Sequence, residues 1–154
     1  MSAHGATIEW RRGDQPFSDK RYSRAHSWTF DGGAVVPGSS APASVPLPMS
    51  DASAVDPEEA MVASLSSCHM LWFLAFAANA GLVVDSYVDE ASGELDPDEA
   101  GRRHLARVAL RPVTAFSGRQ PDQAELDALH HQAHEHCEMA HSVRAAITVH
   151  ATIG

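Results

Sequence analysis

The feature that most constrains the fold of this 154-residue chain is an apolar segment at residues 60–82. It directly follows Asp56-Pro57-Glu58-Glu59, a sequence typical of a helix start. Aspartate can cap a helix, proline suits its first position, and the second glutamate stands where a capping box places its acid. We therefore predict a helix from residue 57 to about residue 80, which Gly81 ends in a left-handed conformation.

Apolar residues cover nearly the whole circumference of this helix, so we expect it to be buried on all sides. A membrane span is disfavoured, because the segment carries Ser64, His69 and Asn79 and directly follows two glutamates. One subunit of this size offers too little surface to cover so long a helix. Its burial therefore points to a second copy of the chain.

Shorter segments of alternating side chains predict strands on both sides of this helix. Residues 7–11 and 22–30 precede it, residues 84–94 and 105–116 follow it as a hairpin, and residues 144–153 form a last strand. Pro121 and Asp122 open a second helix. Residues 31–55, rich in proline, serine and glycine, predict a loop that leaves room for an edge strand, because proline removes the backbone donors that a central strand needs. This order predicts an α+β fold in one domain, residues 1–154, with a mostly antiparallel sheet packed against two helices.

Acidic residues outnumber basic ones by 20 to 11, which gives a formal net charge of -9. No cluster of lysine or arginine stands out, so neither a nucleic acid nor an anionic membrane is expected as a partner. The first residues lack the features of a secretory signal, and we expect a cytoplasmic protein. In a reducing compartment, its two cysteines are more readily explained as reactive, metal-binding or buried thiols than as a structural disulfide.

Cys68 lies about three turns into the apolar helix, where burial raises the pKa of a thiol above its usual value of about 8.5. Cys137 falls near the end of the second helix, on its apolar face, and helix ends move more easily than helix middles. On these local grounds, both cysteines are well explained as small apolar residues of a core.

A reactive Cys68 would need a cation to hold its thiolate ionised. Arg24 is the preferred candidate over Arg21, because it shares a predicted strand face with His26. Glu58 precedes Cys68 by nearly three helical turns, so a long arginine would have to bridge the two. An acid in the first turn is equally well explained as compensation of the helix dipole.

Taken together, these residues resemble the organic hydroperoxide resistance and osmotically inducible peroxidases, Ohr and OsmC. The resemblance rests on Asp56-Pro57-Glu58-Glu59-Ala60 leading through Ser66-Ser67-Cys68 into an apolar helix, and on Cys137 followed by Ser142-Val143 and a terminal strand. It covers residues 22–153 of the chain. His69 stands where the better-known members carry an aromatic residue. In this respect the chain resembles a less-studied branch of the family.

The resemblance implies an intertwined homodimer, in which antiparallel sheets wrap around two central helices. It also implies a thiol-dependent hydroperoxide reductase without metal or other cofactor. By this analogy Cys68 attacks the peroxide and becomes a sulfenic acid, Cys137 resolves it as a disulfide, and a dithiol reductant, such as a lipoyl group, reopens the disulfide. Glu58 would orient Arg24, which holds the thiolate. The peroxide itself, organic hydroperoxide or hydrogen peroxide, stays open.

Two alternatives belong to other functional classes. His130, His134, Cys137 and His141 follow one another at four, three and four residues, which would place zinc or nickel ligands on one helix face. Against a metal site, the sequence has no closely spaced cysteine pair and no His-Glu-x-x-His motif. The second alternative is a binding domain that keeps the fold without catalysis, although the presence of both cysteines argues against it.

Overall fold

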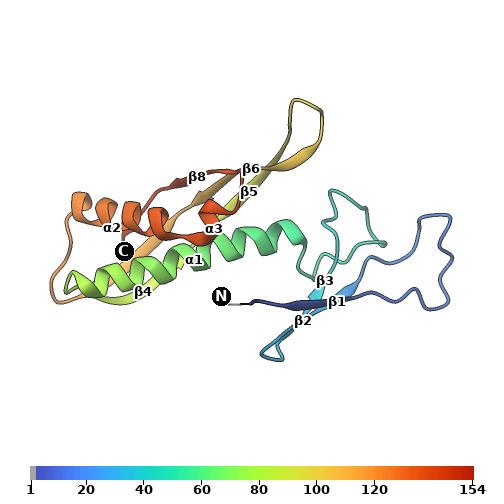
Figure 1. Cartoon of the computed structure of the whole chain (residues 1–154), viewed down its shortest axis with the longest axis horizontal. Helices are drawn as coiled ribbons and strands as arrows, with labels where there is room; N and C mark the ends of the chain where they lie inside the picture. Colours follow the sequence, from blue (N-terminus) through green and yellow to red (C-terminus); the bar gives the residue numbers. More distant parts are fainter. Residues whose placement is uncertain (1–2) are drawn as a thin grey trace. The chain divides into compact units, whose positions relative to one another are not determined.

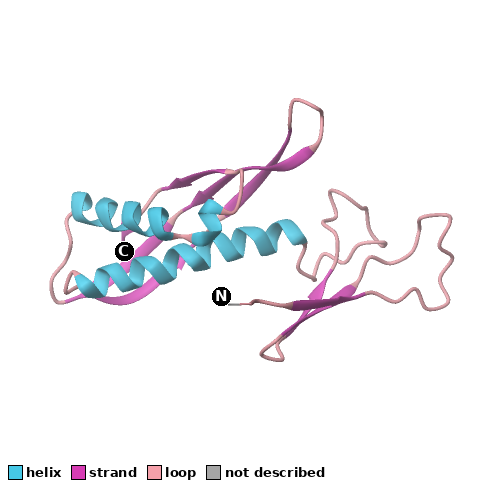
Figure 2. Cartoon of the chain, viewed as in Figure 1, coloured by secondary structure: helices cyan, strands magenta, loops and turns pink. Residues whose placement is uncertain are grey.

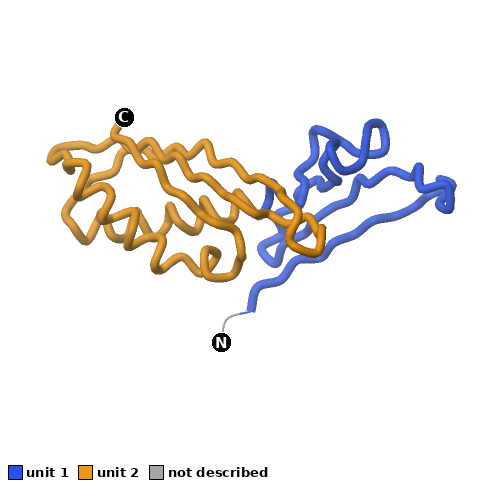
Figure 3. The backbone as a smooth tube through the Cα atoms, turned by 90° about the horizontal axis from the view of Figure 1, so that it is seen from above, with its two compact units in different colours: residues 1–60 blue, residues 61–154 orange. Residues whose placement is uncertain are grey.

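The computed structural model describes residues 3–154, and within them the elements form an α+β fold, as predicted. The chain divides into two compact units, residues 1–60 and residues 61–154, which Figure 3 shows in different colours. The boundary falls in the first turn of the long apolar helix. The organisation as a single domain stays a prediction, and each unit is described by itself.

The unit of residues 1–60 is built on a three-stranded antiparallel sheet in the order β1-β2-β3. Its strands are β1 (Ala6–Glu9), β2 (His26–Phe30) and β3 (Val35–Gly38). A long loop joins β1 to β2, whereas a tight turn joins β2 to β3 (Figure 2). Strand β3 lies inside the segment that was predicted as a loop, and it forms an edge of the sheet, where Pro37 needs no donor.

The strand predicted at residues 22–30 begins only at His26. Arg24 lies before it, because its backbone N–H donates to the carbonyl of Met49 at 2.8 Å instead of pairing with a strand. The prediction that Arg24 shares a strand face with His26 is therefore wrong.

Helix α1 (Pro57–Asn79) begins and ends as the sequence predicts. Asp56 Oδ1 accepts from the backbone N–H of Glu59 at 2.8 Å, and Glu59 Oε2 accepts from that of Asp56 at 3.1 Å, which completes a capping box. At the other end Gly81 has a φ of 73°, a conformation that glycine adopts without a steric penalty.

The predicted hairpin is confirmed, but each of its arms consists of two strands. Strands β4 (Val83–Asp89) and β5 (Ser92–Pro97) pair with β7 (Pro112–Ser117) and β6 (Arg103–Leu110), respectively, in antiparallel register. The two arms are interrupted opposite each other, after Asp89 in one arm and at Arg111 in the other. There Asp89 Oδ1 accepts a hydrogen bond from the backbone N–H of Arg111 at 2.6 Å. This side-chain bond replaces a backbone bond of the ladder and divides the strands between two sheets.

The C-terminal strand is likewise divided, into β8 (Ala146–Val149) and β9 (Thr152–Ile153). Strand β8 pairs with β6 and β9 pairs with β7, and both pairings are parallel. The pairing with β6 extends to the residue after Val149, since the N–H of His150 donates to the carbonyl of Leu110 at 2.9 Å, and the chain then passes to β7. The sheets are thus mostly antiparallel, with parallel strands added at their edges.

The second predicted helix ends earlier than expected. Helix α2 (Gln123–His136) begins at Asp122, whose side chain caps it, and it is followed by the short helix α3 (Glu138–His141). Cys137 separates them with φ and ψ of -72° and 107°, outside the helical region. The prediction that Cys137 lies within a continuous helix is wrong, since its thiol instead accepts the N–H of Ala140 and caps α3.

In the unit of residues 61–154 the core lies between the helices and the strands, and α1 and α2 pack on the same side of its two sheets (Figure 1). Its larger cluster joins Phe73 of α1 to Leu126 of α2, and a second cluster surrounds Leu65 and Leu110. Fully burying an apolar side chain of this size stabilises a fold by roughly 1.5–3 kcal/mol.

Within one copy of the chain, α1 is buried along one stripe only, so its burial on all sides, which was expected to need a second copy, stays a prediction. The buried residues are Leu65, His69, Phe73 and Ala77, four residues apart, whereas Leu71 is 61% exposed. By length and composition alone α1 could also span a membrane, a property that it shares with the core helices of soluble proteins.

We expect Asp56→Ala to destabilise the protein by about 1 kcal/mol, because the N–H of Glu59 loses its acceptor at the start of α1. The measurement is the urea dependence of unfolding followed by circular dichroism. Asp14→Ala, at an exposed position, is the matched control and should change the unfolding free energy by less than about 0.5 kcal/mol. Equal effects of the two substitutions would contradict the assigned role of the cap.

Candidate active site

The two cysteines come together in the unit of residues 61–154, and both are free thiols. Cys68 lies on α1 and is half-buried, whereas Cys137 is 1% exposed at the junction of α2 and α3. Cys137 is near enough for its thiol to raise the pKa of Cys68. Residues that are 69 positions apart in the sequence thus meet through the packing of α1 against this junction.

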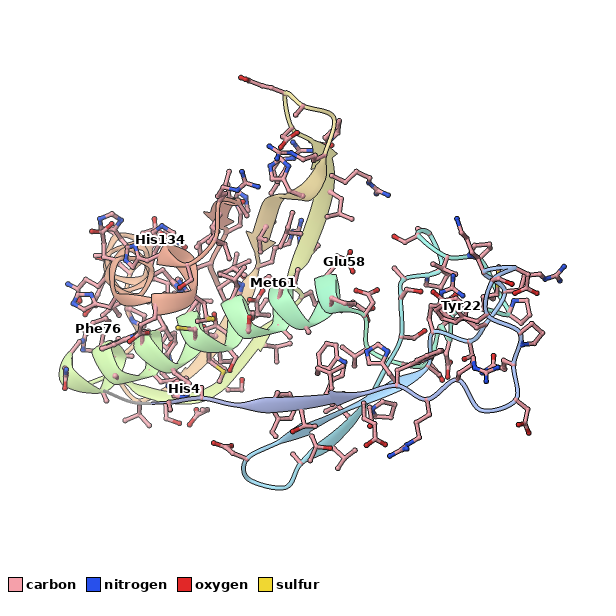
Figure 4. The ribbon with its side chains drawn as sticks, turned by 45° about the vertical axis from the view of Figure 1, so that its right-hand side comes forward. His4, Tyr22, Glu58, Met61, Phe76 and His134 are labelled. Atoms are coloured by element: carbon pink, nitrogen blue, oxygen red, sulfur yellow. The ribbon has the colours of Figure 1, made fainter. Side chains whose placement is uncertain are left out.

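Glu138, the residue after Cys137, contacts the sulfur of Cys68. Its Oε2 accepts from Cys68 Sγ at 3.5 Å and from Trp72 Nε1 at 3.0 Å. Cys68 and Trp72 are one helical turn apart on α1, so they share a face and meet the same carboxylate. Phe76, another turn along the same face (Figure 4), stacks on the Trp72 ring with centroids 5.6 Å apart.

The surroundings of Cys68 favour the protonated thiol. Partial burial is the main cause that raises the pKa of Cys68, to about 11, and the thiol of Cys137 and the carboxylate of Glu138 add to it. The backbone N–H of Met139 opposes them, because a donor near the sulfur favours the thiolate. Hydrogen bonds lower the pKa of Glu138, most of all the one from Trp72, so this side chain is ionised at neutral pH.

Arg24 and Glu58, the other two predicted site residues, line a pocket of about 530 Å³ in the unit of residues 1–60. Glu58 stands in the first turn of α1 (Figure 4). The guanidinium of Arg24 lies 3.8 Å above the Tyr22 ring and donates to the carbonyls of Tyr22 and Lys20. Arg24 and Glu58 share the pocket but form no ion pair with each other within residues 3–154.

One wall of this pocket is aromatic. The Phe17 and Tyr22 rings stack with centroids 4.6 Å apart, and the Trp10 ring meets Tyr22 edge-on at 5.3 Å. Trp10 Nε1 donates to the carbonyl of Ser23 at 2.8 Å, which fixes its ring. Such a wall suits an apolar ligand, and Arg24 and Glu58 supply charges at its edge.

His69, directly after Cys68, faces away from it into the core. Its Nε2 lies 2.9 Å from His130 Nδ1, and the His130 ring stacks on Phe73 with centroids 4.2 Å apart. Burial lowers the pKa of His69 to about 4 and that of His130 to about 3, with smaller contributions from His134 and from the partner ring, respectively. Both rings are therefore neutral at physiological pH and share one hydrogen bond.

The arrangement expected for a metal site is not present. Cys137 and His141 do not continue the face of α2, because that helix ends at His136, and His130 uses Nδ1 to reach His69. Across residues 3–154, no three histidine, cysteine or acidic side chains are grouped so that they could hold a metal ion.

Comparison with known proteins identifies the family. Residues 50–152 match the family model described as OsmC-like protein, and this match covers more than half of the chain. The chain belongs to the OsmC-like family. None of the curated proteins matches it.

Solved structures of this family have the same fold. An OsmC-like protein of unknown function from Vibrio cholerae is 45% identical, with a TM-score of 0.96 over 99% of this chain and 100% of its own. An organic hydroperoxide resistance protein from Elizabethkingia anophelis is 18% identical, with a TM-score of 0.73 over 100% and 96% of the two chains. The organic hydroperoxide resistance protein OhrB of Bacillus subtilis, also 18% identical, has a TM-score of 0.61 over 99% and 98%. At 18% identity, the latter two show the shared fold.

Sequence reasoning missed Glu138 and Trp72 as neighbours of the thiol, and His130 as the partner of His69. An acidic residue directly after the second cysteine was a usable signal for Glu138. Trp72 could have been placed beside Cys68 from its helical spacing. No sequence pattern pairs His69 with His130, because their contact depends on the packing of α1 against α2.

The neutral histidine pair predicts a pH-dependent stability. In the unfolded chain each ring binds a proton near pH 6.5, whereas in the fold the pKa values are about 4 and about 3. The stability is thus fully present above about pH 6.5 and falls as the pH drops below it, by up to about 1.4 kcal/mol per pH unit for each ring. The test is the urea midpoint between pH 5 and pH 7, where few carboxylates titrate.

Replacing both partners, as His69→Leu with His130→Leu, should flatten this dependence, because no buried ring is left to protonate. His131→Gln removes an exposed histidine of α2 and is the matched control. An unchanged slope in the double variant would show that other groups cause the dependence.

Proposed function

We propose that this OsmC-like protein reduces organic hydroperoxides, with Cys68 as the attacking thiol and Cys137 as the resolving thiol. The observation that carries the proposal is the meeting of two free cysteines across α1 and the junction of α2 and α3. Membership of a family that includes hydroperoxide resistance proteins supports it. The 530 Å³ pocket with its aromatic wall suits the organic part of such a substrate.

The proposed cycle has three steps. The sulfur of Cys68 attacks one peroxide oxygen, the O–O bond breaks, and a sulfenic acid and an alcohol form. The thiol of Cys137 then displaces the sulfenic hydroxyl, which leaves as water, and an S–S bond forms. A dithiol reductant, of which a lipoyl group is one example, finally reduces this disulfide and is itself oxidised to a cyclic disulfide.

Arg24 and Glu58 are proposed to serve the first step. A thiol whose pKa is about 11 is almost entirely protonated at pH 7, so its ionisation needs a favourable charge. An arginine keeps its charge at any working pH and suits this role. Glu58 would orient Arg24, which lines the same pocket.

The proposal predicts that the protein consumes cumene hydroperoxide in the presence of dihydrolipoamide and that Cys68→Ser abolishes this activity. Cys137→Ser should allow one turnover and then stop at the sulfenic acid, which mass spectrometry detects after trapping with dimedone. Arg24→Met should slow the first step by about 100-fold, if its charge supplies about 3 kcal/mol to the transition state.

Ser67→Ala is the matched control, because Ser67 is the exposed neighbour of Cys68 on α1. It should retain the wild-type rate. Absence of peroxide consumption by the wild-type protein with any dithiol, or full activity of Cys68→Ser, would rule out the proposed function.

We further propose that the protein is a homodimer in which a second copy covers the exposed face of α1. Leu71 of that face is 61% exposed and Met61 is 40% exposed, although both are large and apolar. Apolar side chains on a helix face usually mark a contact surface when they are contiguous. A second copy of this chain carries the same face, which allows a symmetric contact.

Static light scattering at micromolar concentration should therefore give about twice the chain mass of 16.5 kDa. Leu71→Glu should shift the protein to a monomer, because it would bury a charge in the contact. Leu47→Glu is a matched control on the first unit, since Leu47 is 60% exposed. A monomeric wild-type protein, or an unchanged dimer in Leu71→Glu, would contradict the proposed contact.

A further inference from the structure

We propose that Glu138 is a catalytic base and acid for Cys68, a role that rests on the proposed peroxidase function. Glu138 contacts the reacting sulfur directly, with 3.5 Å between its Oε2 and Cys68 Sγ. A nucleophile within hydrogen-bond reach of a base, with the base oriented by a third group, is the arrangement of an activated nucleophile. Here the third group is Trp72, whose Nε1 donates to the same carboxylate oxygen at 3.0 Å.

The reaction needs a group that moves one proton. The thiol loses its proton when the S–O bond forms, and the alcohol oxygen gains one when the O–O bond breaks. Glu138 Oε2 takes the proton of Cys68 Sγ as sulfur attacks, and it then delivers this proton to the departing oxygen. Sulfur is oxidised, the peroxide is reduced, and no other proton donor or acceptor is required.

Charge explains why a carboxylate suits this position. The thiol with an ionised Glu138 and the thiolate with a protonated Glu138 carry the same net charge, so the transfer creates no new repulsion between them. In the resting state the proton stays on sulfur, because burial disfavours the thiolate and hydrogen bonds favour the carboxylate. Delivery of the proton to the departing oxygen returns Glu138 to its ionised form, so it is ready for the next turnover.

His69 is the other obvious base near Cys68, and its geometry argues against this role. Its side chain belongs to the buried stripe of α1, 1% exposed, and its Nε2 faces His130 at 2.9 Å. Consecutive residues of a helix point about 100° apart, so His69 does not share the face of Cys68. Glu138 lies on the face that Cys68 and Trp72 present.

The test measures the rate at which cumene hydroperoxide oxidises Cys68 in a Cys137→Ser background, where Cys68 is the sole cysteine. Glu138→Gln keeps the shape of the side chain but cannot accept the proton, and it should slow this step by about 100-fold, a typical loss for an acid or base. Glu138→Asp should restore part of the rate. Trp72→Phe, which removes the orienting N–H, should cause a smaller loss.

The pH profile separates proton transfer from a structural role. With Glu138 present, the rate should change little between pH 6 and pH 8, because the carboxylate stays ionised. In Glu138→Gln the rate should rise by about tenfold per pH unit, since attack then depends on the small fraction of free thiolate. Glu135→Gln removes an exposed acid of α2 and should leave both rate and profile unchanged.

Two results would overturn the role of Glu138. The first is an unchanged rate and pH profile in Glu138→Gln. The second is a faster reaction of this variant with both the peroxide and iodoacetamide, which would mean that the carboxylate only represses the thiolate. Either result can be obtained while the protein with both cysteines remains an active peroxidase, so failure of this inference is distinguishable from failure of the proposed function.

Discussion

The packing of α1 against α2 is the contact on which the candidate site depends. Phe73 and Leu126 belong to the same buried cluster, and their burial fixes the position of one helix along the other. Cys68 lies on the adjacent face of α1, so the same packing brings its sulfur to Glu138 and to the buried Cys137. Well-packed cores resist displacement, and the two sulfurs are consequently held by the core of the unit.

Burial and reactivity oppose each other at Cys68. A site that excludes water protects the thiol, yet it also disfavours the thiolate that attacks peroxides. The unit of residues 61–154 places the carboxylate of Glu138 beside the sulfur of Cys68. This carboxylate can accept the thiol proton, but it adds no positive charge. The positive charge proposed for the reaction belongs to Arg24, in the other unit. Proton acceptance and charge stabilisation are thus assigned to different parts of the chain.

The buried pair of His69 and His130 shows how a polar side chain can occupy a position that suits an aromatic residue. Each imidazole has a flat ring that packs like an aromatic side chain, and their shared hydrogen bond at 2.9 Å satisfies one nitrogen of each. Keeping the rings neutral avoids the larger cost of a buried charge. Because Nδ1 of His130 is used in this contact, His130 is not arranged with His134 as the metal ligand that their spacing had suggested.

The sequence by itself determined the elements whose signals are local. The capping residues Asp56 and Glu59 and the helix-ending Gly81 define α1, and the alternating segments define most strands. The relation between Cys68 and Cys137 followed only from the resemblance to a family. Tertiary structure decided the contacts of Glu138, the pairing of His69 with His130 and the break of the second helix at Cys137. These features depend on side chains far apart in the sequence, whose meeting is set by how the helices and strands pack, and periodicity within one segment carries no information about that packing.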